Sequence, residues 1–313
     1  MSKIVEEVTL GIDVGQLSLD IFGANLNDVL SIENNETAIR AFLGSFSGPV
    51  AIAVEATGVF HEMLVDIAQE FGFTVYLIDG YRVNKYREAV GVRAKTDPND
   101  ARLIHRYLVA ERALLRPIVQ QNQEVRLLWR LLKRRAKVVK LRAQLQLSLQ
   151  GLMINDADKE VAITGLDGLI KQLTDQAKRL AKTLNWGESL ARLETIPGVG
   201  ELIALGLRAM YARGEFTNAD RFIAFLGLDI RVRDSGKHRG RRKLSKKGDS
   251  EIRRLLFNGA RSAATHRKYW GSLKAQYMAR GMSEIQVSVA LSRKLARIAY
   301  AILRDETVYE TPV

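Results

Sequence analysis

The fold of this chain is decided by residues 11–22, GIDVGQLSLDIF. Apolar residues lie on both sides of Gly15-Gln16, a pair that can make a tight turn, so the pattern predicts a β-hairpin with strands at residues 5–14 and 17–26. Asp13 lies one residue before the end of the first strand. The hairpin therefore places a carboxylate near the edge of the sheet that it begins.

The sequence that follows predicts the rest of a sheet covered by helices. Residues 50–54, VAIAV, form a continuous apolar run, which is typical of a strand buried on both faces. Asn35 or Thr37 can cap a short helix. The other expected elements are strands at 29–33 and 74–78 and helices at 58–71 and 99–111. Apolar strands separated by helices indicate an α/β domain.

Three more acidic residues accompany Asp13 at matching places in this pattern. Glu55 follows the buried strand in VAIAVEATG, and Asp97 and Asp100 lie in AKTDPNDAR. Because Asp97 and Asp100 are three residues apart, they share one face of a helix. Carboxylates from separate segments can hold one or two Mg²⁺ ions against a phosphodiester, since a hard cation prefers oxygen ligands. The four acids therefore predict a metal-dependent site that acts on nucleic acid.

Each acid also has an ordinary structural interpretation. Asp97 before Pro98 makes a good helix N-cap, and Asp100 then lies in the first turn, where a negative charge stabilises the helix. Glu55 can be a surface carboxylate that pairs with an arginine. The metal-site prediction therefore depends on the order of all four acids along the chain and not on any single one.

Composition favours a polyanionic partner and excludes several other classes. The 313 residues contain 48 Lys and Arg against 35 Asp and Glu, a net charge of +13, which is typical of nucleic-acid-binding proteins. The absence of cysteine excludes disulfides and thiolate zinc sites. No export signal and no long apolar run is present, so a cytoplasmic bacterial protein without membrane contact is expected.

The middle of the chain predicts a helical hairpin. Residues 123–153 form a long amphipathic pattern whose polar faces are strongly basic, with Arg130 and Arg134 as candidate nucleic-acid contacts. A second helix at 166–184 can return antiparallel to the first, as a hairpin or as a coiled-coil seam between subunits. A solvated basic surface is the alternative interpretation.

The last third begins with LETIPGVGELIALGL, residues 193–207. A Pro-Gly-Val-Gly turn between two apolar helical stretches is typical of a helix-hairpin-helix element, in which glycines let the backbone approach a phosphate. Gly198 and Gly200 are therefore candidate nucleic-acid-binding residues. A simple turn between packed helices is the alternative.

A dense basic segment follows at residues 231–247, where nine of the seventeen residues are Lys or Arg and only Asp234 opposes them. Ser235 precedes Gly236 in this segment, which favours an active-site loop whose cations stabilise a phosphoryl transition state. Ser245 is the competing serine. The candidate phosphate ligands are Lys237, Arg239, Arg241, Arg242, Lys246 and Lys247.

The element order of the first third resembles the ribonuclease H and RuvC-like nuclease fold. In that fold, acids on the first strand, at the end of the fourth strand and on a late helix meet at one sheet edge. The matching positions here are Asp13, Glu55, Asp97 and Asp100.

The whole chain resembles the DEDD transposases of the 110 family of bacterial insertion sequences and their Piv-type DNA invertase relatives. The resemblance rests on the four acids followed by IPGVG, FLGL, DSGKHRG, LSKKG and IRRLLF in that order. It implies a RuvC-like catalytic domain at residues 1–118, a coiled-coil segment at 119–190 and a mainly helical transposase domain at 191–313.

The resemblance also implies a mechanism. Ser235 would attack DNA to form a covalent phosphoserine intermediate, while the four acids hold Mg²⁺. Members of the family use a structured noncoding RNA, encoded by the element, as a bridge that pairs with donor and target DNA. They also assemble as tetramers from dimers. The expected partners are therefore DNA, a bridge RNA and further copies of this chain.

Other functions stay open from the sequence alone. A RuvC-like junction nuclease needs the acids but not Ser235, and a site-specific invertase shares the chemistry on another substrate. A non-catalytic nucleic-acid-binding protein needs neither. GIDVG also resembles the phosphate-binding hairpin of sugar-kinase and actin-like ATPases, but the chain offers no second glycine-rich phosphate loop.

Overall fold

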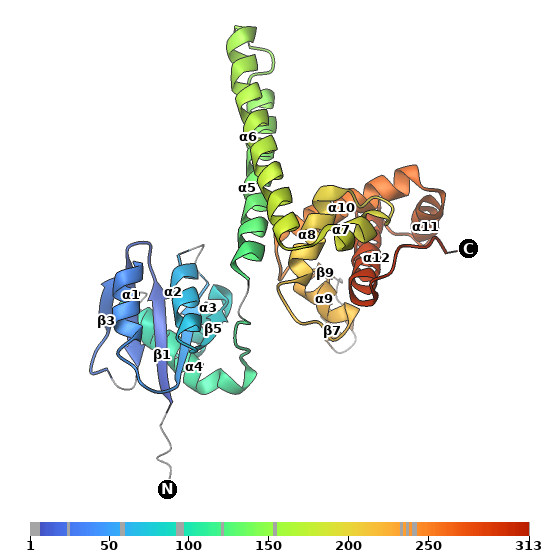
Figure 1. Ribbon diagram of the computed structural model, residues 1–313. Coiled ribbons are helices and arrows are strands. Elements are labelled where there is room, and N and C mark those ends of the chain that lie inside the picture. The colour runs from blue at the N-terminus through green and yellow to red at the C-terminus, as the bar shows by residue number, and fades with distance from the viewer. Residues whose placement is uncertain are drawn as a thin grey trace. The chain divides into compact units, whose positions relative to one another are not determined.

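The structure is a computed structural model that describes residues 7–23, 26–56, 60–91, 97–119, 122–152, 155–231, 234–235, 238–239 and 243–312. The chain forms two compact units, Met1–Gln120 and Gln121–Val313 (Figure 1). The second unit contains nearly all of the helical segment expected at 119–190 together with residues 191–313. The division of this part into a coiled-coil segment and a transposase domain stays a prediction.

The first unit is built on a five-stranded mixed sheet in the order β3-β2-β1-β4-β5. The strands β1, β2 and β3 pair antiparallel, whereas β4 and β5 continue from β1 in parallel. This topology confirms the α/β class and the RuvC-like arrangement. The strands are β1 (Val8–Val14), β2 (Ser18–Gly23), β3 (Leu30–Glu33), β4 (Val50–Glu55) and β5 (Thr74–Ile78).

Helices cover both faces of this sheet. On one face, the even-numbered residues of β1 and β4 pack with the buried side chains of α1 and α2. On the other face, Ala51 and Ala53 of β4 pack with side chains of α3 and α4. Because side chains alternate along a strand, Asp13 and Glu55 lie on the face of α3 and α4. The helices are α1 (Glu36–Leu43), α2 (Glu62–Glu70), α3 (Gly80–Ala89) and α4 (Asp97–Glu111), followed by the 3₁₀ turn η1 (Arg112–Leu114).

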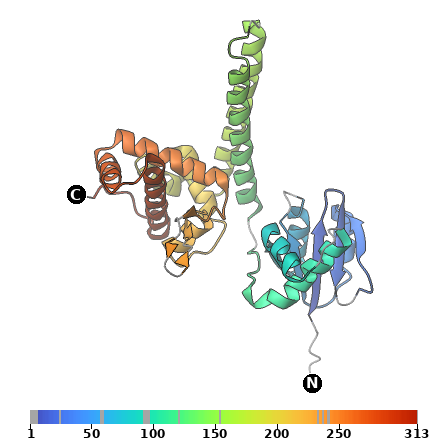
Figure 2. The ribbon, with the colours of Figure 1, turned by 180° about the vertical axis from the view of Figure 1, so that it is seen from behind.

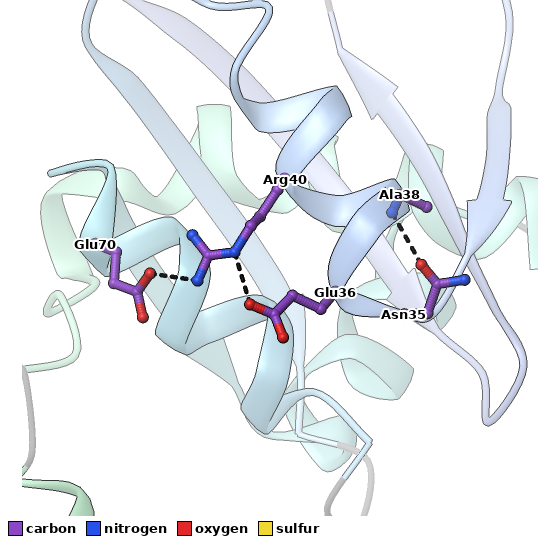
Figure 3. Close-up of polar contacts among 5 residues, drawn as sticks. All are labelled: Asn35, Glu36, Ala38, Arg40 and Glu70. Atoms are coloured by element: carbon purple, nitrogen blue, oxygen red, sulfur yellow. Dashed lines mark hydrogen bonds and ion pairs between the residues drawn. The ribbon is translucent and has the colours of Figure 1, made fainter.

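The helix α1 shows how the sequence fixes a boundary. The side-chain oxygen of Asn35 accepts a hydrogen bond from the Ala38 amide at 2.9 Å, so Asn35 is the N-cap (Figure 3). Arg40 then joins Glu36 of the same helix, at 2.8 Å, to Glu70 of α2, at 2.6 Å (Figure 3). These contacts fix α1 and α2 against each other on the sheet face that is remote from the acids.

Some expected boundaries in the first unit were wrong. The amide of Gly15 donates to the Ser18 carbonyl at 2.9 Å, so Gln16 and Leu17 form the turn, one residue later than expected. The helix expected at 99–111 begins at Asp97, and the helix expected at 58–71 spans Glu62–Glu70. Helix α3 was not expected, because only Val83 of its ten residues is buried and its sequence lacks an apolar stripe.

The second unit begins with two long helices, α5 (Gln123–Ser148) and α6 (Asp156–Thr183), which run side by side as an antiparallel hairpin (Figures 1 and 2). The expected hairpin is therefore present, but α6 starts ten residues before the expected position, where Asn155 accepts a hydrogen bond from the Ala157 amide. Only the base of α5, from Val125 to Leu132, is buried. The hairpin base shares its core with the C-terminal helices, and the rest extends as an arm.

The remaining residues form a mainly helical body, as expected, around one apolar core that includes Trp270 and Phe222. Helix α11 contributes Trp270, its one buried residue, to this core. No helix within the described residues has both the length and the apolar character needed to span a membrane. The helices are α7 (Gly187–Glu194), α8 (Glu201–Tyr211), α9 (Ala219–Phe225), α10 (Ser250–His266), α11 (Lys268–Ala279) and α12 (Glu284–Asp305).

Candidate functional site

Asp13 and Glu55 are brought together by parallel strand pairing. The register of β1 and β4 sets Ile12 opposite Val54, so the next positions along both strands are Asp13 and Glu55. Both carboxylates therefore lie at the same sheet edge, at the carboxyl ends of neighbouring parallel strands. The Asp13 carboxylate accepts a hydrogen bond from the Val14 amide at 3.1 Å.

The position of Glu55 depends on the first residue of α3. A Cβ atom added to Gly80 would lie 2.4 Å from Oε1 of Glu55. The carboxylate therefore lies directly against the glycine Cα, in space that any other side chain would fill. Helix α3, which was not predicted, thus begins beside one of the predicted acids.

Helix α4 crosses β1 at Gly11 in backbone contact. A Cβ atom there would lie 2.2 Å from the His105 nitrogen and 2.5 Å from the Ala101 carbonyl oxygen. The side chain of His105 reaches back to an earlier residue of β1, because its ring nitrogen Nε2 bonds to Oγ1 of Thr9 at 2.9 Å. Helix α4 therefore runs antiparallel to β1. Its first turn, which contains Asp97 and Asp100, is directed toward the Asp13 end of the strand.

Asp100 is buried and paired with a cation that the sequence analysis missed. Its Oδ1 accepts a hydrogen bond from Nη2 of Arg87, a residue of α3, at 2.5 Å. The side chains of Arg87 and Asp100 are only 11% and 7% exposed. Arg87 also donates to Oδ1 of Asn84 at 2.8 Å. No sequence signal singled out Arg87, because it lies on a polar helix without periodicity.

These acids suit a divalent cation in chemistry but are only partly assembled. Among the side chains that the structure describes, no three His, Asp or Glu residues gather as a metal-binding set. The side chain of Asp97 lies outside that part of the chain. Asp13 and Glu55 place carboxylate oxygens, the ligand type that a hard cation prefers, at one edge of the sheet, and the Asp100 carboxylate is paired with Arg87.

Ser235 lies near the tip of a short β-ribbon instead of a plain loop. The pair β6 (Ile230–Arg231) and β9 (Lys243–Leu244) forms the base of the ribbon. Farther out, β7 (Asp234–Ser235) pairs with β8 (His238–Arg239), and Ser235 is opposite His238. Only residues 236 and 237 separate the two strands. The side chains of residues 232–242, which include Ser235, Lys237, Arg239, Arg241 and Arg242, lie outside the described part.

The competing serine, Ser245, helps to close the base of this ribbon. Its hydroxyl donates a short hydrogen bond to the Asp229 carboxylate and accepts one from the Lys247 amide at 3.2 Å. The Ser245 amide donates to the Asp229 carbonyl at 2.8 Å, and the residue is 9% exposed. The Ser245 hydroxyl is therefore engaged in holding two chain segments together. Lys246 and Lys247 beside it are exposed.

The two glycines of the IPGVG turn have different surroundings. Gly198 has a positive φ of 82°, and a Cβ there would lie 2.2 Å from the Gly259 carbonyl oxygen of α10. This glycine therefore serves helix packing. Gly200, the N-cap of α8, has no atom within 4 Å of its Cβ position. Both glycines line a cleft of about 590 Å³ together with Arg267 and Lys268, and Gly200 is the one with open space at its Cβ position.

The predicted basic face of the hairpin is present at Arg130 and Arg134, both of which are exposed on α5. Nearby, Asp249 caps α10 and accepts a hydrogen bond from the Trp129 ring nitrogen at 3.1 Å. Lys133 lies 3.4 Å from the same carboxylate. Part of the basic face is therefore tied to the C-terminal helices.

A ribonuclease H-like sheet with acids at its edge, in a strongly basic chain, suits the class of enzymes that act on the phosphodiesters of nucleic acid. Two family models agree with this class. The DEDD transposase model of IS110 matches residues 10–154, and the model described as Transposase IS116/IS110/IS902 family matches residues 190–277. The chain belongs to the IS110 family of transposases, and it is accordingly an enzyme of DNA recombination.

Individual relatives extend over most of the chain. The pilin gene-inverting protein of Moraxella lacunata is 28% identical over 272 residues, covering 83% of this chain and 81% of that protein. The transposase for insertion sequence element IS1111A of Coxiella burnetii is 29% identical over 280 residues, covering 76% and 73%. A solved structure, T. thermophilus RuvC in complex with a Holliday junction substrate, is 15% identical. It covers 36% of this chain and 100% of its own, with a TM-score of 0.28.

Proposed function

We propose that this chain transposes an insertion sequence in the bacterial cytoplasm by Mg²⁺-dependent cleavage and rejoining of DNA through a covalent phosphoserine intermediate. The observation that carries the proposal is the convergence of Asp13, Glu55 and the first turn of α4 at one end of β1. Family membership supplies the class of reaction. The acids supply the site where a phosphodiester can be held.

In this proposal Asp13, Glu55, Asp97 and Asp100 hold Mg²⁺. The bound ion would neutralise charge on the scissile phosphate and polarise it for attack. The carboxylates themselves position the ion at the sheet edge, and the contact of α4 with Gly11 keeps the helix acids at a fixed distance from the strand acids. The position of Asp13 and Glu55 on the same face of the sheet supports this role as metal ligands.

Ser235 is the proposed nucleophile. Its Oγ forms a bond to phosphorus while the bond from phosphorus to one deoxyribose oxygen breaks, and the hydroxyl proton passes to that leaving oxygen. Attack by a hydroxyl of another strand reverses the step and reseals the backbone without an external energy source. The position of Ser235 near a ribbon tip supports this role, and the engaged hydroxyl of Ser245 favours Ser235 over Ser245.

We also propose that exposed basic groups bind the nucleic-acid backbone. The open amide end of α8 at Gly200 suits a phosphate, since helix N-termini carry unsatisfied amides and partial positive charge. The further members of this set are Arg130, Arg134, Lys237, Arg239, Arg241, Arg242, Lys246 and Lys247. Gly198, which lines the same cleft, belongs to this proposed set as well and also packs against α10.

A bridge RNA and a tetramer assembled from dimers complete the proposal. The net charge of +13 suits a complex with more than one nucleic acid. The arm of α5 and α6 exposes large apolar side chains that a second subunit can cover, among them Leu147 at 71% and Val161 at 73%. Base pairing by an RNA would supply target specificity that backbone contacts alone do not carry.

The decisive experiment is a denaturing-gel assay for a covalent adduct of protein and DNA. Purified protein, Mg²⁺, element-end DNA and RNA from the flanking region are combined, and wild type is compared with Ser235→Ala, Ser245→Ala and Asp13→Ala. An adduct that Ser235→Ala and Asp13→Ala abolish, but Ser245→Ala retains, supports the proposal. Cleaved DNA without any adduct would instead favour a RuvC-like hydrolytic junction nuclease.

An invertase is the second candidate, because the pilin gene-inverting relative covers 83% of this chain. The two functions share chemistry and differ in the arrangement of their sites. A plasmid that carries the element ends in inverted orientation distinguishes them. Inversion of the intervening segment without any excision or insertion would identify an invertase.

A further inference from the structure

We propose that Arg87 is a counter-cation of the acidic site, which neutralises Asp100 and competes with a divalent cation for that carboxylate. The inference rests on the proposed function of Asp100 as a metal ligand. It adds a residue, Arg87, that neither the family resemblance nor the four-acid pattern includes.

The contacts of Arg87 fit this role. One guanidinium nitrogen bonds to Asp100 Oδ1 at 2.5 Å and another to Asn84 Oδ1 at 2.8 Å. The third, Nε, is buried and has no hydrogen-bond partner among the described residues. The guanidinium is therefore held in the protein interior by one charged partner and is incompletely satisfied.

Burial makes a cationic partner of Asp100 important. A carboxylate that is 7% exposed loses most of its hydration, so a positive partner stabilises its charge. Arg87 supplies that positive charge. A divalent cation at the same oxygen would supply it as well, and two cations cannot approach one carboxylate oxygen without strong mutual repulsion.

The arrangement of the acids agrees with such competition. The start of α3, at Gly80, lies against Glu55, and Arg87, in the last turn of the same helix, binds Asp100. No three acids gather among the described side chains, and Oδ1 of Asp100 is bound to Arg87. Release of Asp100 from Arg87 would make this oxygen available to a cation at the same sheet edge.

The test measures Mn²⁺ binding to the full-length protein without DNA, by electron paramagnetic resonance of the free ion, so that the readout does not depend on activity. The variant Arg87→Met removes the competing charge while preserving side-chain length. Arg87→Lys keeps the charge and checks for loss of packing alone. Arg82→Met is the matched control, because Arg82 is an exposed arginine on the same helix.

We expect Arg87→Met to bind Mn²⁺ about tenfold more tightly than wild type, which corresponds to about 1.4 kcal/mol. Arg87→Lys and Arg82→Met should stay close to wild type, and Asp100→Asn should bind more weakly. Without Mn²⁺, Arg87→Met should melt at a lower temperature than wild type, because Asp100 is left buried and unpaired, and Mn²⁺ should restore more stability to it than to wild type.

Two outcomes would overturn the inference, and they differ. Unchanged Mn²⁺ affinity in Arg87→Met, with binding lost in Asp13→Ala and Glu55→Ala, would show that Arg87 pairs with Asp100 for structure alone while the proposed cation site stands. Absence of Mn²⁺ binding in wild type and in every variant would remove the proposed cation site, and the competition with it.

Discussion

The substitution Gly11→Ala tests whether the contact between α4 and β1 positions the acids. The added Cβ would lie 2.2 Å from the backbone nitrogen of His105, whereas ordinary contacts begin at 3.4 Å. The helix would therefore have to move outward by about 1.2 Å, since backbone atoms cannot rotate away. Overpacking of this kind costs about 1–3 kcal/mol of stability. A shift of about 1 Å at a catalytic group can lower a rate about 10²-fold.

We expect Gly11→Ala to cleave element-end DNA about 10²-fold more slowly while its salt-sensitive DNA binding changes little. The assay is single-turnover cleavage, with amide exchange of α4 as the measure of helix displacement. Gly165→Ala is the control, because no atom lies within 4 Å of its added Cβ and alanine is the better helix former. Wild-type cleavage and unchanged α4 exchange in Gly11→Ala would refute the positioning role of this contact.

Three further predictions follow from single contacts. Gly80→Ala should slow cleavage with little loss of stability, because its Cβ would meet the movable end of the Glu55 side chain, 2.4 Å away. Thermal unfolding measures the change in stability, and the cleavage rate measures the change at the site. Ser245→Ala should lower the yield of adduct in the gel assay without abolishing it, unlike Ser235→Ala, because it loosens the ribbon base and spares the nucleophile. Burial lowers the pKa of His105 below 6.5, partly opposed by its hydrogen bond with Thr9, so the unfolded chain binds the proton more readily. Stability should therefore fall as the pH drops from about 6.5 toward the lower folded pKa, and His105→Gln should flatten this slope in thermal melts between pH 5 and 8.

The strand acids could be predicted because their positions follow from local pattern and element order. Alternation along β1 fixes the face of Asp13, and the apolar run of β4 ends at Glu55. Once both strands are recognised, parallel pairing makes these two residues neighbours. Helix α3 was not predicted because only Val83 is buried among its ten residues. The ion pair between Arg87 of this helix and Asp100 could therefore not be predicted either.

Contacts between distant segments are what the sequence could not supply. The phosphate-binding role of the IPGVG turn stays a prediction, and the structure adds that Gly198 packs against Gly259, which lies sixty-one residues farther along the chain. Ser245 stays a competing nucleophile, and the structure adds that its hydroxyl is bound to Asp229. Neither partner can be identified from a single sequence, because glycine and serine have the same local pattern in a packed turn and in a functional one.

The candidate site is positioned by a backbone contact, and this contact should matter more for cleavage than any single surface charge. Gly11 holds α4 on β1 through backbone atoms, which have no rotamers to absorb an added group. The exposed arginines of α5, such as Arg130 and Arg134, are proposed members of a large set in which each phosphate contact would contribute a small, salt-dependent share. When one such arginine is removed, the remaining basic residues still supply most of the binding free energy. One methyl group at Gly11, in contrast, displaces the whole of α4 with its two acids. The cleavage rate should therefore fall more in Gly11→Ala than in a variant that loses any single exposed cation of the basic face.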